Sequence, residues 1–230
     1  MESFKEVYND LKDDNMHLIY NYINKDLVIK KSDGYIYFRQ VIGPKFVTVC
    51  RLVEQKAIDR LIKVHSRLIK EGYQHNFYII GDGPEKDKLK EMIKHEQVEN
   101  TFQLLGKKEN PYPYIKNADY FCLLSYFEGY GMVLEEAKIL NKKIIITDTA
   151  ARECIQNYEY CSIVDNNEKA IYDVLKDCIF NKNDREKQEV IPDSTEEHDR
   201  QIQFEKAEEF EELRKILEEN REKEKERFER

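Results

Sequence analysis

Two carboxylates and two glycines stand close together in one segment of the chain, residues 125–137. Glu128 and Glu136 are eight positions apart, and Gly129 and Gly131 lie between them. A short apolar and aromatic run precedes the segment, which predicts a buried strand, and good helix formers follow the second glycine. The first N–H groups of a helix have no partner inside it, and the helix dipole is positive there, so an anion such as a phosphate binds readily. We therefore expect a phosphate pocket here, flanked by Glu128 and Glu136.

Two cations follow an earlier strand. Residues 46–50 are mostly β-branched or aromatic and predict a strand, Arg51 comes directly after it, and Lys56 begins the next predicted helix. Taken alone, Arg51 and Lys56 would be read as surface bases. Because the carboxyl ends of parallel strands share one edge of a sheet, we expect both cations to face the glycine segment. Two cations beside a phosphate cradle suit a diphosphate.

Strands and helices alternate between residues 45 and 180. This alternation predicts an α/β domain with a doubly wound, mostly parallel, Rossmann-like sheet, whose ligand lies at the carboxyl ends of the strands. The predicted strands are 46–50, 77–80, 101–105, 119–124, 143–147 and 161–164, and the predicted helices are 57–70, 85–96, 111–117, 132–140, 151–157 and 168–180.

The two ends of the chain differ from this middle part. Residues 1–44 are expected to be a linker segment from a missing N-terminal domain, with a short helix at 4–11, a strand at 15–23 and a polar stretch at 25–40. Residues 181–230 hold eighteen acidic and twelve basic side chains, and predict a long charged C-terminal helix. A solvated helix is favoured over a binding role, although its narrow apolar stripe leaves a coiled-coil seam open. The stripe is formed by Phe204, Ala207, Phe210, Leu213 and Leu217.

The composition excludes several classes of protein. A formal net charge of −8 argues against a nucleic-acid binder, which needs a basic surface. The sequence shows no signal-peptide core and no apolar run as long as a membrane span. Its five cysteines are scattered, with no Cys-x-x-Cys pair, so a zinc site is not expected. Reduced, packed thiols instead suggest a cytoplasmic protein.

Other candidate motifs favour structural roles. The turn at 81–84, Gly-Asp-Gly-Pro, is not a full G-x-G-x-x-G fingerprint, and the loop after the first strand has no glycine, so a nicotinamide cofactor is not expected. No P-loop motif occurs, and the five histidines show no metal spacing. His65 falls on a largely apolar helix face and is predicted to be packed. Tyr112, Tyr114 and Tyr120 are expected in the core or at its rim, and not as a base-stacking platform.

The motifs described above occur in a fixed order along the chain. They are residues 46–52, Gln55-Lys56, residues 80–84, Leu105-Gly106 and residues 128–137. In this order they resemble the C-terminal, donor-binding half of a retaining GT-B glycosyltransferase of the family-four, "glycosyl transferases group 1" type. The resemblance covers about residues 15–180, and the Glu-x7-Glu spacing from Glu128 to Glu136 is its most specific part.

The resemblance implies a role for each matched residue. Arg51 and Lys56 would grip the diphosphate of a nucleotide sugar and stabilise charge on the departing nucleoside diphosphate. Glu128 would contact the sugar, and no metal or other cofactor would be needed. A UDP-sugar is the first expectation and GDP-mannose the second. The remaining donor-binding residues would be Glu136 for the ribose, the backbone near Gly106 and Lys108 for the base, and the amides near Tyr130, Gly131 and Met132 for the sugar and diphosphate.

The chain also departs from the family pattern. Cys50 and Ala57 stand where family members usually have glycine. The N-terminal acceptor domain, which often carries a catalytic histidine, is missing, so the chain is expected to bind nucleotide and to transfer little or no sugar by itself. Peripheral membrane association through a full-length parent, and self-association through the charged helix, stay open.

Two other hypotheses compete with a transferase domain that serves surface polysaccharide or glycoconjugate synthesis. One is a non-catalytic, Rossmann-like interaction module whose charged helix pairs with a partner chain. The other, ranked last, is a phosphosugar enzyme of related fold, such as a sugar-nucleotide epimerase. Binding of UDP separates the first two readings, because only the transferase domain requires it.

Overall fold

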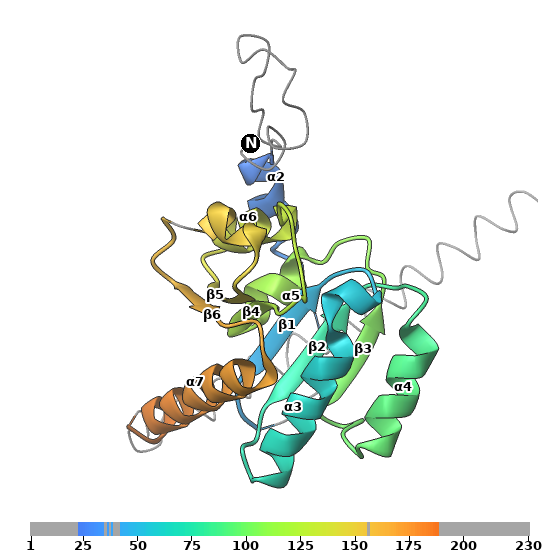
Figure 1. Cartoon of the computed structure of the whole chain (residues 1–230). Helices are drawn as coiled ribbons and strands as arrows, with labels where there is room; N and C mark the ends of the chain where they lie inside the picture. The colour runs from blue at the N-terminus through green and yellow to red at the C-terminus, as the bar shows by residue number, and fades with distance from the viewer. Residues whose placement is uncertain (1–22, 35, 37, 39–41, 156, 189–230) are drawn as a thin grey trace, which may run out of the picture. The chain divides into compact units, whose positions relative to one another are not determined.

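The computed structural model describes residues 23–34, 36, 38, 42–155 and 157–188 (Figure 1). The expected helix at 4–11, nearly all of the expected strand at 15–23 and the charged tail beyond residue 188 lie outside the described residues. The chain divides into two units, Met1–Asp184 and Arg185–Arg230, and the sheet belongs to the first.

A six-stranded parallel sheet forms the centre of the first unit, with the order β3-β2-β1-β4-β5-β6. Each predicted strand is confirmed to within one residue at either end. The strands alternate with helices along the chain and are buried as continuous apolar runs, which is typical of a parallel sheet covered on both faces. Their bounds are β1 (Lys45–Val49), β2 (Asn76–Ile80), β3 (Phe102–Gly106), β4 (Tyr120–Leu123), β5 (Lys143–Thr147) and β6 (Cys161–Val164).

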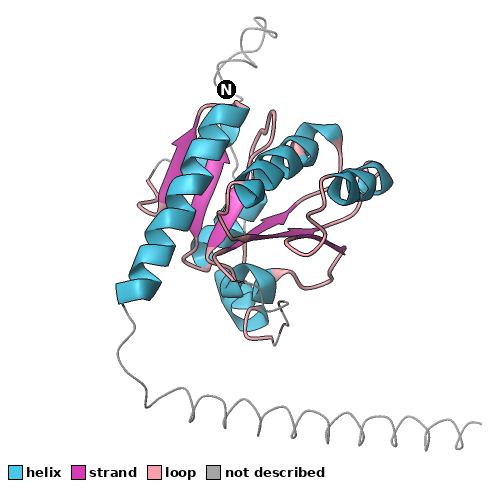
Figure 2. Cartoon of the chain, turned by 90° about the horizontal axis from the view of Figure 1, so that it is seen from below, coloured by secondary structure: helices cyan, strands magenta, loops and turns pink. Residues whose placement is uncertain are grey.

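Helices cover both faces of the sheet, as Figures 1 and 2 show. One hydrophobic cluster packs α3 (Ile58–Lys70), α4 (Lys86–His95) and α7 (Glu168–Gln188) against one face. The other cluster packs α5 (Tyr112–Asn117), α6 (Met132–Ile139) and the 3-10 helix η3 (Ala150–Ile155) against the opposite face. The doubly wound, Rossmann-like fold that the sequence predicts is therefore confirmed.

Stacked aromatic rings connect neighbouring strands on the face of the sheet that α3, α4 and α7 cover. The ring centroids of Phe46 and Phe77 are 4.9 Å apart, those of Phe46 and Tyr120 are 4.9 Å apart, and those of Phe77 and Phe102 are 5.7 Å apart. These four residues are buried on four adjacent strands. Burying each side chain stabilises the fold by roughly 1.5–3 kcal/mol.

Two buried histidines form a hydrogen-bonded chain under the same face. His75 Nδ1 lies 2.8 Å from the carbonyl oxygen of Tyr73 and must donate to it, so its Nε2 is an acceptor. His65 Nδ1 therefore donates to His75 Nε2 at 2.8 Å, and His65 Nε2 accepts from the Thr101 hydroxyl at 2.8 Å. The prediction that His65 is packed is confirmed, and both rings are neutral in this arrangement.

Residues 25–40, read from the sequence only as a polar stretch, contain the helix α2 (Lys25–Lys31), which was not predicted. Asn24 caps the helix by accepting from the backbone N–H of Leu27 at 3.0 Å. Asp26 lies in the first turn and basic residues lie in the last, which suits the helix dipole. Val28 is buried where α2 packs on α5 and α6.

The last helix also exceeds its prediction, since α7 runs to Gln188 and does not stop at 180. The last buried apolar residue is Ile179, and Phe180, where the predicted helix ends, is 59% exposed. The next residues contain neither glycine nor proline, so the helix can continue past its packed face.

The five cysteines are all free, as expected.

Candidate active site

The loops after β1 and β4 meet at the point where the strand order reverses. β1 pairs with both β2 and β4, so the chain winds outward in opposite directions on its two sides. In open parallel sheets, ligands bind at this switch point, outside the carboxyl ends of the strands. The predicted cations and the predicted glycine segment are therefore on the same edge, as the sequence indicates.

Lys56 and Glu128 form an ion pair that joins the two loops. Lys56 ends the 3-10 helix η2 (Glu54–Lys56), and its Nζ donates to Glu128 Oε2. The Lys56 and Glu128 side chains are only 17% and 13% exposed. Gln55 adds two hydrogen bonds between the same loops. Its side-chain Nε2 donates to the carbonyl oxygen of Phe127 at 2.9 Å, and its backbone carbonyl oxygen accepts from the backbone N–H of Tyr126 at 2.9 Å. The structure thus brings together two of the three residues predicted as catalytic.

Ala57 makes the turn between η2 and α3. Its backbone is left-handed, with φ 51° and ψ 35°, and the residue is 1% exposed. This conformation costs roughly 1–2 kcal/mol for a residue other than glycine. Ala57, which stands where the family usually has glycine, therefore adopts a left-handed backbone that glycine would adopt without strain. Burial of its methyl group offsets part of the conformational cost.

Arg51 is exposed at the end of β1, and the backbone on both sides of it is held by the turn after β2. Cys50 N donates to Ile80 O at 3.0 Å, and Leu52 N donates to Asp82 O at 3.0 Å. A Cβ on Gly81 would lie 1.8 Å from Cys50 O. The Gly-Asp-Gly-Pro turn is therefore glycine-rich so that it can pack against the Arg51 loop.

A buried arginine missed by the sequence reading supports the loop after β4. Arg60 is 4% exposed, its Nη2 donates to Leu124 O at 2.8 Å, and its Nη1 donates to Asn166 Oδ1 at 2.9 Å. Its guanidinium carbon lies 4.4 Å from the ring centroid of Tyr126, and Asn166 Nδ2 donates to Tyr126 O at 2.5 Å. Helical spacing could have found it, because Arg60 is three residues after Ala57 on the apolar face of α3.

Glu136 is half-buried on α6 and accepts a hydrogen bond from the Tyr112 hydroxyl at 3.0 Å. Burial raises the pKa of Glu136, and the bond from Tyr112 acts in the opposite direction. Tyr112 is half-buried on α5, as expected of a residue at the rim of the core, but its hydroxyl contacts a predicted site residue. That contact was not foreseen.

The other predicted donor-binding residues lie at the same edge. Gly131 is buried at the start of α6, where its backbone bonds to the Cys154 thiol, whose pKa is raised by burial. Tyr130 and Met132 are 37% and 42% exposed on either side of it. Gly106 ends β3 with φ +72°, and Lys108 Nζ lies 5.8 Å from the ring centroid of Tyr114.

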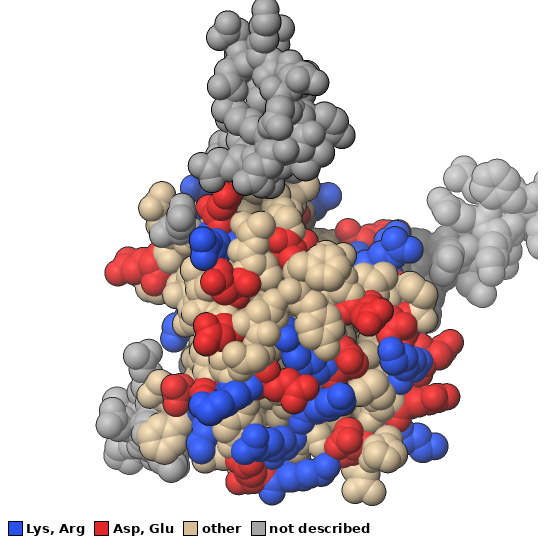
Figure 3. Space-filling view, viewed as in Figure 1, with Lys and Arg blue, Asp and Glu red and all other residues tan. Residues whose placement is uncertain are grey.

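Acidic and basic side chains are interspersed on the face of the molecule seen in Figure 3. Ion pairs among the described residues include Lys86 with Asp82 at 2.9 Å and Arg152 with Asp148 at 3.1 Å. Within the described residues, no group of three His, Cys, Asp or Glu side chains is arranged to hold a metal ion. Among the helices in that part of the chain, none has the length and apolar character to cross a bilayer.

Known proteins share both the sequence and the fold. The family model described as "Glycosyl transferases group 1" matches residues 40–191. The chain is 31% identical over 163 residues to a Campylobacter jejuni relative, N-acetylgalactosamine-N,N'-diacetylbacillosaminyl-diphospho-undecaprenol 4-alpha-N-acetylgalactosaminyltransferase, which covers 69% of this chain and 43% of the relative. It is 35% identical over 112 residues to a glycosyltransferase of Methanocaldococcus jannaschii, which covers 48% of this chain and 28% of that protein.

Two solved structures show the same fold. Anabaena HepE in complex with UDP-glucose superposes with a TM-score of 0.60 at 15% identity, over 77% of this chain and 51% of that one. A Staphylococcus aureus TarM variant with UDP gives a TM-score of 0.58 at 21% identity, over 79% and 37%. The chain thus spans less than half the length of the two curated relatives it matches here. The ordered motifs, the switch-point site and the family match together place this chain in the glycosyl transferases group 1 family, with the Rossmann-like fold of one half of a GT-B protein.

Proposed function

We propose that the chain is the donor-binding domain of a retaining glycosyltransferase, with a nucleoside-diphosphate sugar, first of all a UDP-sugar, as its donor. The observation that carries the proposal is the ion pair of Lys56 with Glu128 at the switch point, on the same strand–loop–helix unit as the half-buried Glu136. The Campylobacter jejuni relative is named as an N-acetylgalactosaminyltransferase, and HepE and TarM have been crystallised with UDP or UDP-glucose.

The diphosphate would bind between the two loops. Arg51 is exposed at the end of β1, Lys56 is held at the end of η2, and α6 begins just after the loop that carries Glu128, the partner of Lys56. Two cations and a helix start supply the positive charge that a leaving nucleoside diphosphate needs. We therefore propose that transfer proceeds without a bound metal ion or other cofactor.

The sugar would lie against Glu128. Its carboxylate is fixed by Lys56 and by the hydroxyl of Ser125, at 3.4 Å, so it meets a sugar hydroxyl in a defined orientation. The backbone near Tyr130, Gly131 and Met132 would bind the sugar and the diphosphate.

The nucleoside would extend along the same edge. Glu136 would accept from the two ribose hydroxyls, and the backbone near Gly106 and Lys108 would line the base. This order, from diphosphate to base, follows the edge from the loop after β4 to the end of β3.

The acceptor side would come from a further domain. The relatives are more than twice as long as the matched region, which leaves room for an acceptor domain in a longer protein. The chain alone would then bind the donor and transfer little sugar. We place the parent enzyme in the cytoplasm, in surface polysaccharide or glycoconjugate synthesis, where it could associate peripherally with a membrane.

A non-catalytic interaction module, whose charged tail would pair with a partner chain, stays the second candidate. Such a module has no need for the Lys56–Glu128 pair or for a half-buried Glu136. Its ranking below the transferase domain follows from these two features.

Calorimetry with UDP tests the proposal. We expect the intact chain to bind UDP, and Glu136→Ala and Arg51→Ala each to weaken binding by about tenfold or more, because each removes a charge-assisted contact. Two control variants remove the same side chains elsewhere. Glu135→Ala changes the neighbouring carboxylate, which pairs with Lys138 at 2.8 Å, and Arg67→Ala removes a cation that is 64% exposed beside Glu71. Unchanged UDP binding in both Glu136→Ala and Arg51→Ala would refute the assigned pocket.

A further inference from the structure

We infer that Tyr112 is a positioning residue for the nucleoside end of the donor, because its hydroxyl fixes one carboxylate oxygen of Glu136 and leaves the other to meet the ribose hydroxyls. The inference rests on the proposed role of Glu136 as the ribose-binding acid. It adds a residue to the site that no motif assigns, and it links the site to α2.

The contact between the two side chains has a defined direction. A phenol has a single proton to donate, and the Tyr112 oxygen lies 3.0 Å from Glu136 Oε1, so the proton points at that oxygen. The terminal torsion of a glutamate is broad and roughly two-fold, so an unheld carboxylate samples many orientations. A bond to Oε1 selects one of them and turns Oε2 away from Tyr112.

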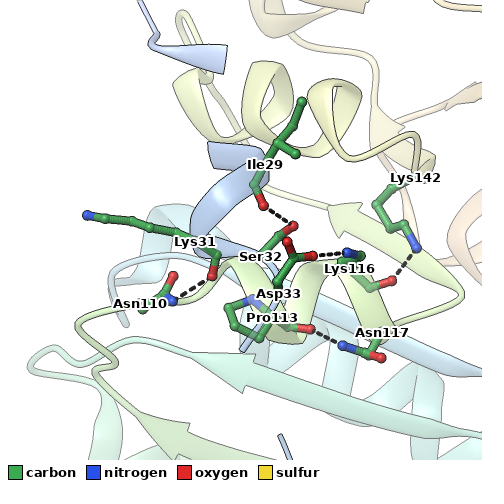
Figure 4. A network of polar contacts seen from close by, with 9 residues as sticks. All are labelled: Ile29, Lys31, Ser32, Asp33, Asn110, Pro113, Lys116, Asn117 and Lys142. Atoms are coloured by element: carbon green, nitrogen blue, oxygen red, sulfur yellow. Dashed lines mark hydrogen bonds and ion pairs between the residues drawn. The ribbon is translucent and has the colours of Figure 1, made fainter. Parts of the chain in front are cut away.

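Tyr112 is itself fixed from the other side. Its backbone N–H donates to Asn110 Oδ1 at 3.3 Å, and Asn110 Nδ2 donates to the carbonyl oxygen of Lys31 at 2.8 Å, at the end of α2. Figure 4 shows the Asn110 bond to Lys31 within a wider polar network. A continuous chain of contacts therefore runs from α2 through Asn110 and Tyr112 to Glu136.

The same network holds α2 on α5. Lys116 Nζ donates to Asp33 Oδ1 at 2.5 Å, just after α2, and Lys142 Nζ donates to Lys116 O at 2.6 Å (Figure 4). The Ser32 hydroxyl closes α2 by donating to Ile29 O at 2.7 Å. Asn110, just before α5, and Lys116, in its last turn, thus tie both ends of this short helix to the α2 segment, which holds α5 and its Tyr112 in place.

The test compares UDP with 2′-deoxy-UDP, which lacks one of the two ribose hydroxyls. Calorimetry on the intact chain gives the ratio of the two affinities. If Tyr112 orients Glu136 for the ribose, Tyr112→Phe lowers the affinity for UDP by about 5–10-fold, the value of one hydrogen bond, and lowers the affinity for 2′-deoxy-UDP less. The ratio therefore shrinks. In a Glu136→Ala background, the same substitution changes neither affinity.

Tyr158→Phe is the matched control. Its hydroxyl donates to Lys142 O at 2.8 Å, and its ring packs in the same hydrophobic cluster as that of Tyr112, so the substitution removes an equivalent hydroxyl away from Glu136. We expect it to leave the ratio of affinities unchanged. Asn110→Ala, which cuts the tie to α2, should shift the ratio in the same direction as Tyr112→Phe and by a smaller factor.

Three results would overturn the inference, and they are distinguishable. If Tyr112→Phe lowers both affinities by the same factor, Tyr112 has only a structural role. If it changes neither affinity, Tyr112 has no role in binding. In both cases the proposed function still stands, provided that Glu136→Ala lowers the affinity for UDP. If the unaltered chain binds neither nucleotide, the proposed function and the inference fail together.

Discussion

Replacing Gly81 with alanine tests whether the turn after β2 holds the Arg51 loop in place. Gly81 has φ +147°, a conformation that costs about 1–3 kcal/mol for other residues. Its new Cβ would also lie 1.8 Å from Cys50 O, where real Cβ atoms essentially never approach within 3.0 Å. That overlap involves backbone on both sides, so no side-chain rotation can relieve it.

The turn would have to part from β1. Two backbone bonds hold it there, Cys50 N to Ile80 O and Leu52 N to Asp82 O, both at 3.0 Å. Losing them costs about 2 kcal/mol at roughly 1 kcal/mol each. Together with the conformational cost, we expect Gly81→Ala to lower the free energy of unfolding by about 3–5 kcal/mol.

Gly72→Ala is the matched control. Gly72 has φ +90°, and a Cβ there would meet nothing within 4 Å, so only the conformational cost applies. Part of this cost is offset because alanine restricts the unfolded chain, which leaves a loss of about 1 kcal/mol. Urea unfolding followed by far-UV circular dichroism measures both variants, since the chain has no tryptophan. A loss for Gly81→Ala no larger than that for Gly72→Ala would refute the reasoning.

Three further predictions concern the buried histidines, the buried arginine and the ion pair. Burial lowers the pKa of His75 from 6.5 to about 4, so its neutral ring stabilises the fold fully above pH 6.5, and stability falls as the pH drops toward 4. Between pH 7.5 and 5 this amounts to about 2 kcal/mol, seen in urea unfolding as a pH dependence that His75→Asn reduces but does not abolish, since burial also lowers the pKa of His65. Arg60→Met should lower the free energy of unfolding by about 3 kcal/mol in the same assay, because it leaves a buried carbonyl oxygen without a hydrogen bond. Arg60→Lys should not restore this stability, because lysine lacks the planar guanidinium group. Recovery by the lysine variant would contradict the geometry. Lys56→Ala should lower the affinity for UDP about tenfold in calorimetry and leave the affinity for uridine unchanged, because Lys56 contacts only the diphosphate, which uridine lacks. An equal loss of affinity for uridine would contradict this role of Lys56.

Much of the fold could be predicted because parallel strands are buried on both faces. Runs such as Ile144-Ile145-Ile146 are apolar at every position, and each is followed by a glycine turn or a helix signal. α2 was missed for the opposite reason. Only Val28 is buried in it, whereas Leu27 and Ile29 are 46% and 42% exposed, so no apolar face is visible in the sequence. Its local signals were the cap at Asn24 and the charges at its two ends, Asp26 in the first turn and lysines in the last.

The site was predictable as a set of loops on one edge, but the partners within it were not. That Lys56 and Glu128 share an edge follows from the strand order, whereas their direct contact depends on how η2 turns. The bond from Tyr112 to Glu136 depends on the packing of α5 against α6, and no local pattern encodes it. Arg60 was missed for a different reason. Its helical spacing places it on the apolar face of α3, but a charged side chain is not normally predicted to be buried in the core.

The ion pair between Lys56 and Glu128 also bears on how the protein folds. The two residues are 72 positions apart, and closing a loop of that length costs about 4 kcal/mol in chain entropy. Both side chains are mostly buried, so the attraction of the pair is largely cancelled by the loss of hydration and cannot offset that cost. The pairing of β1 with β4 must bring the two loops together first, so the donor pocket is a late product of folding. In a refolding experiment, the capacity to bind nucleotide should therefore appear after the helices have formed.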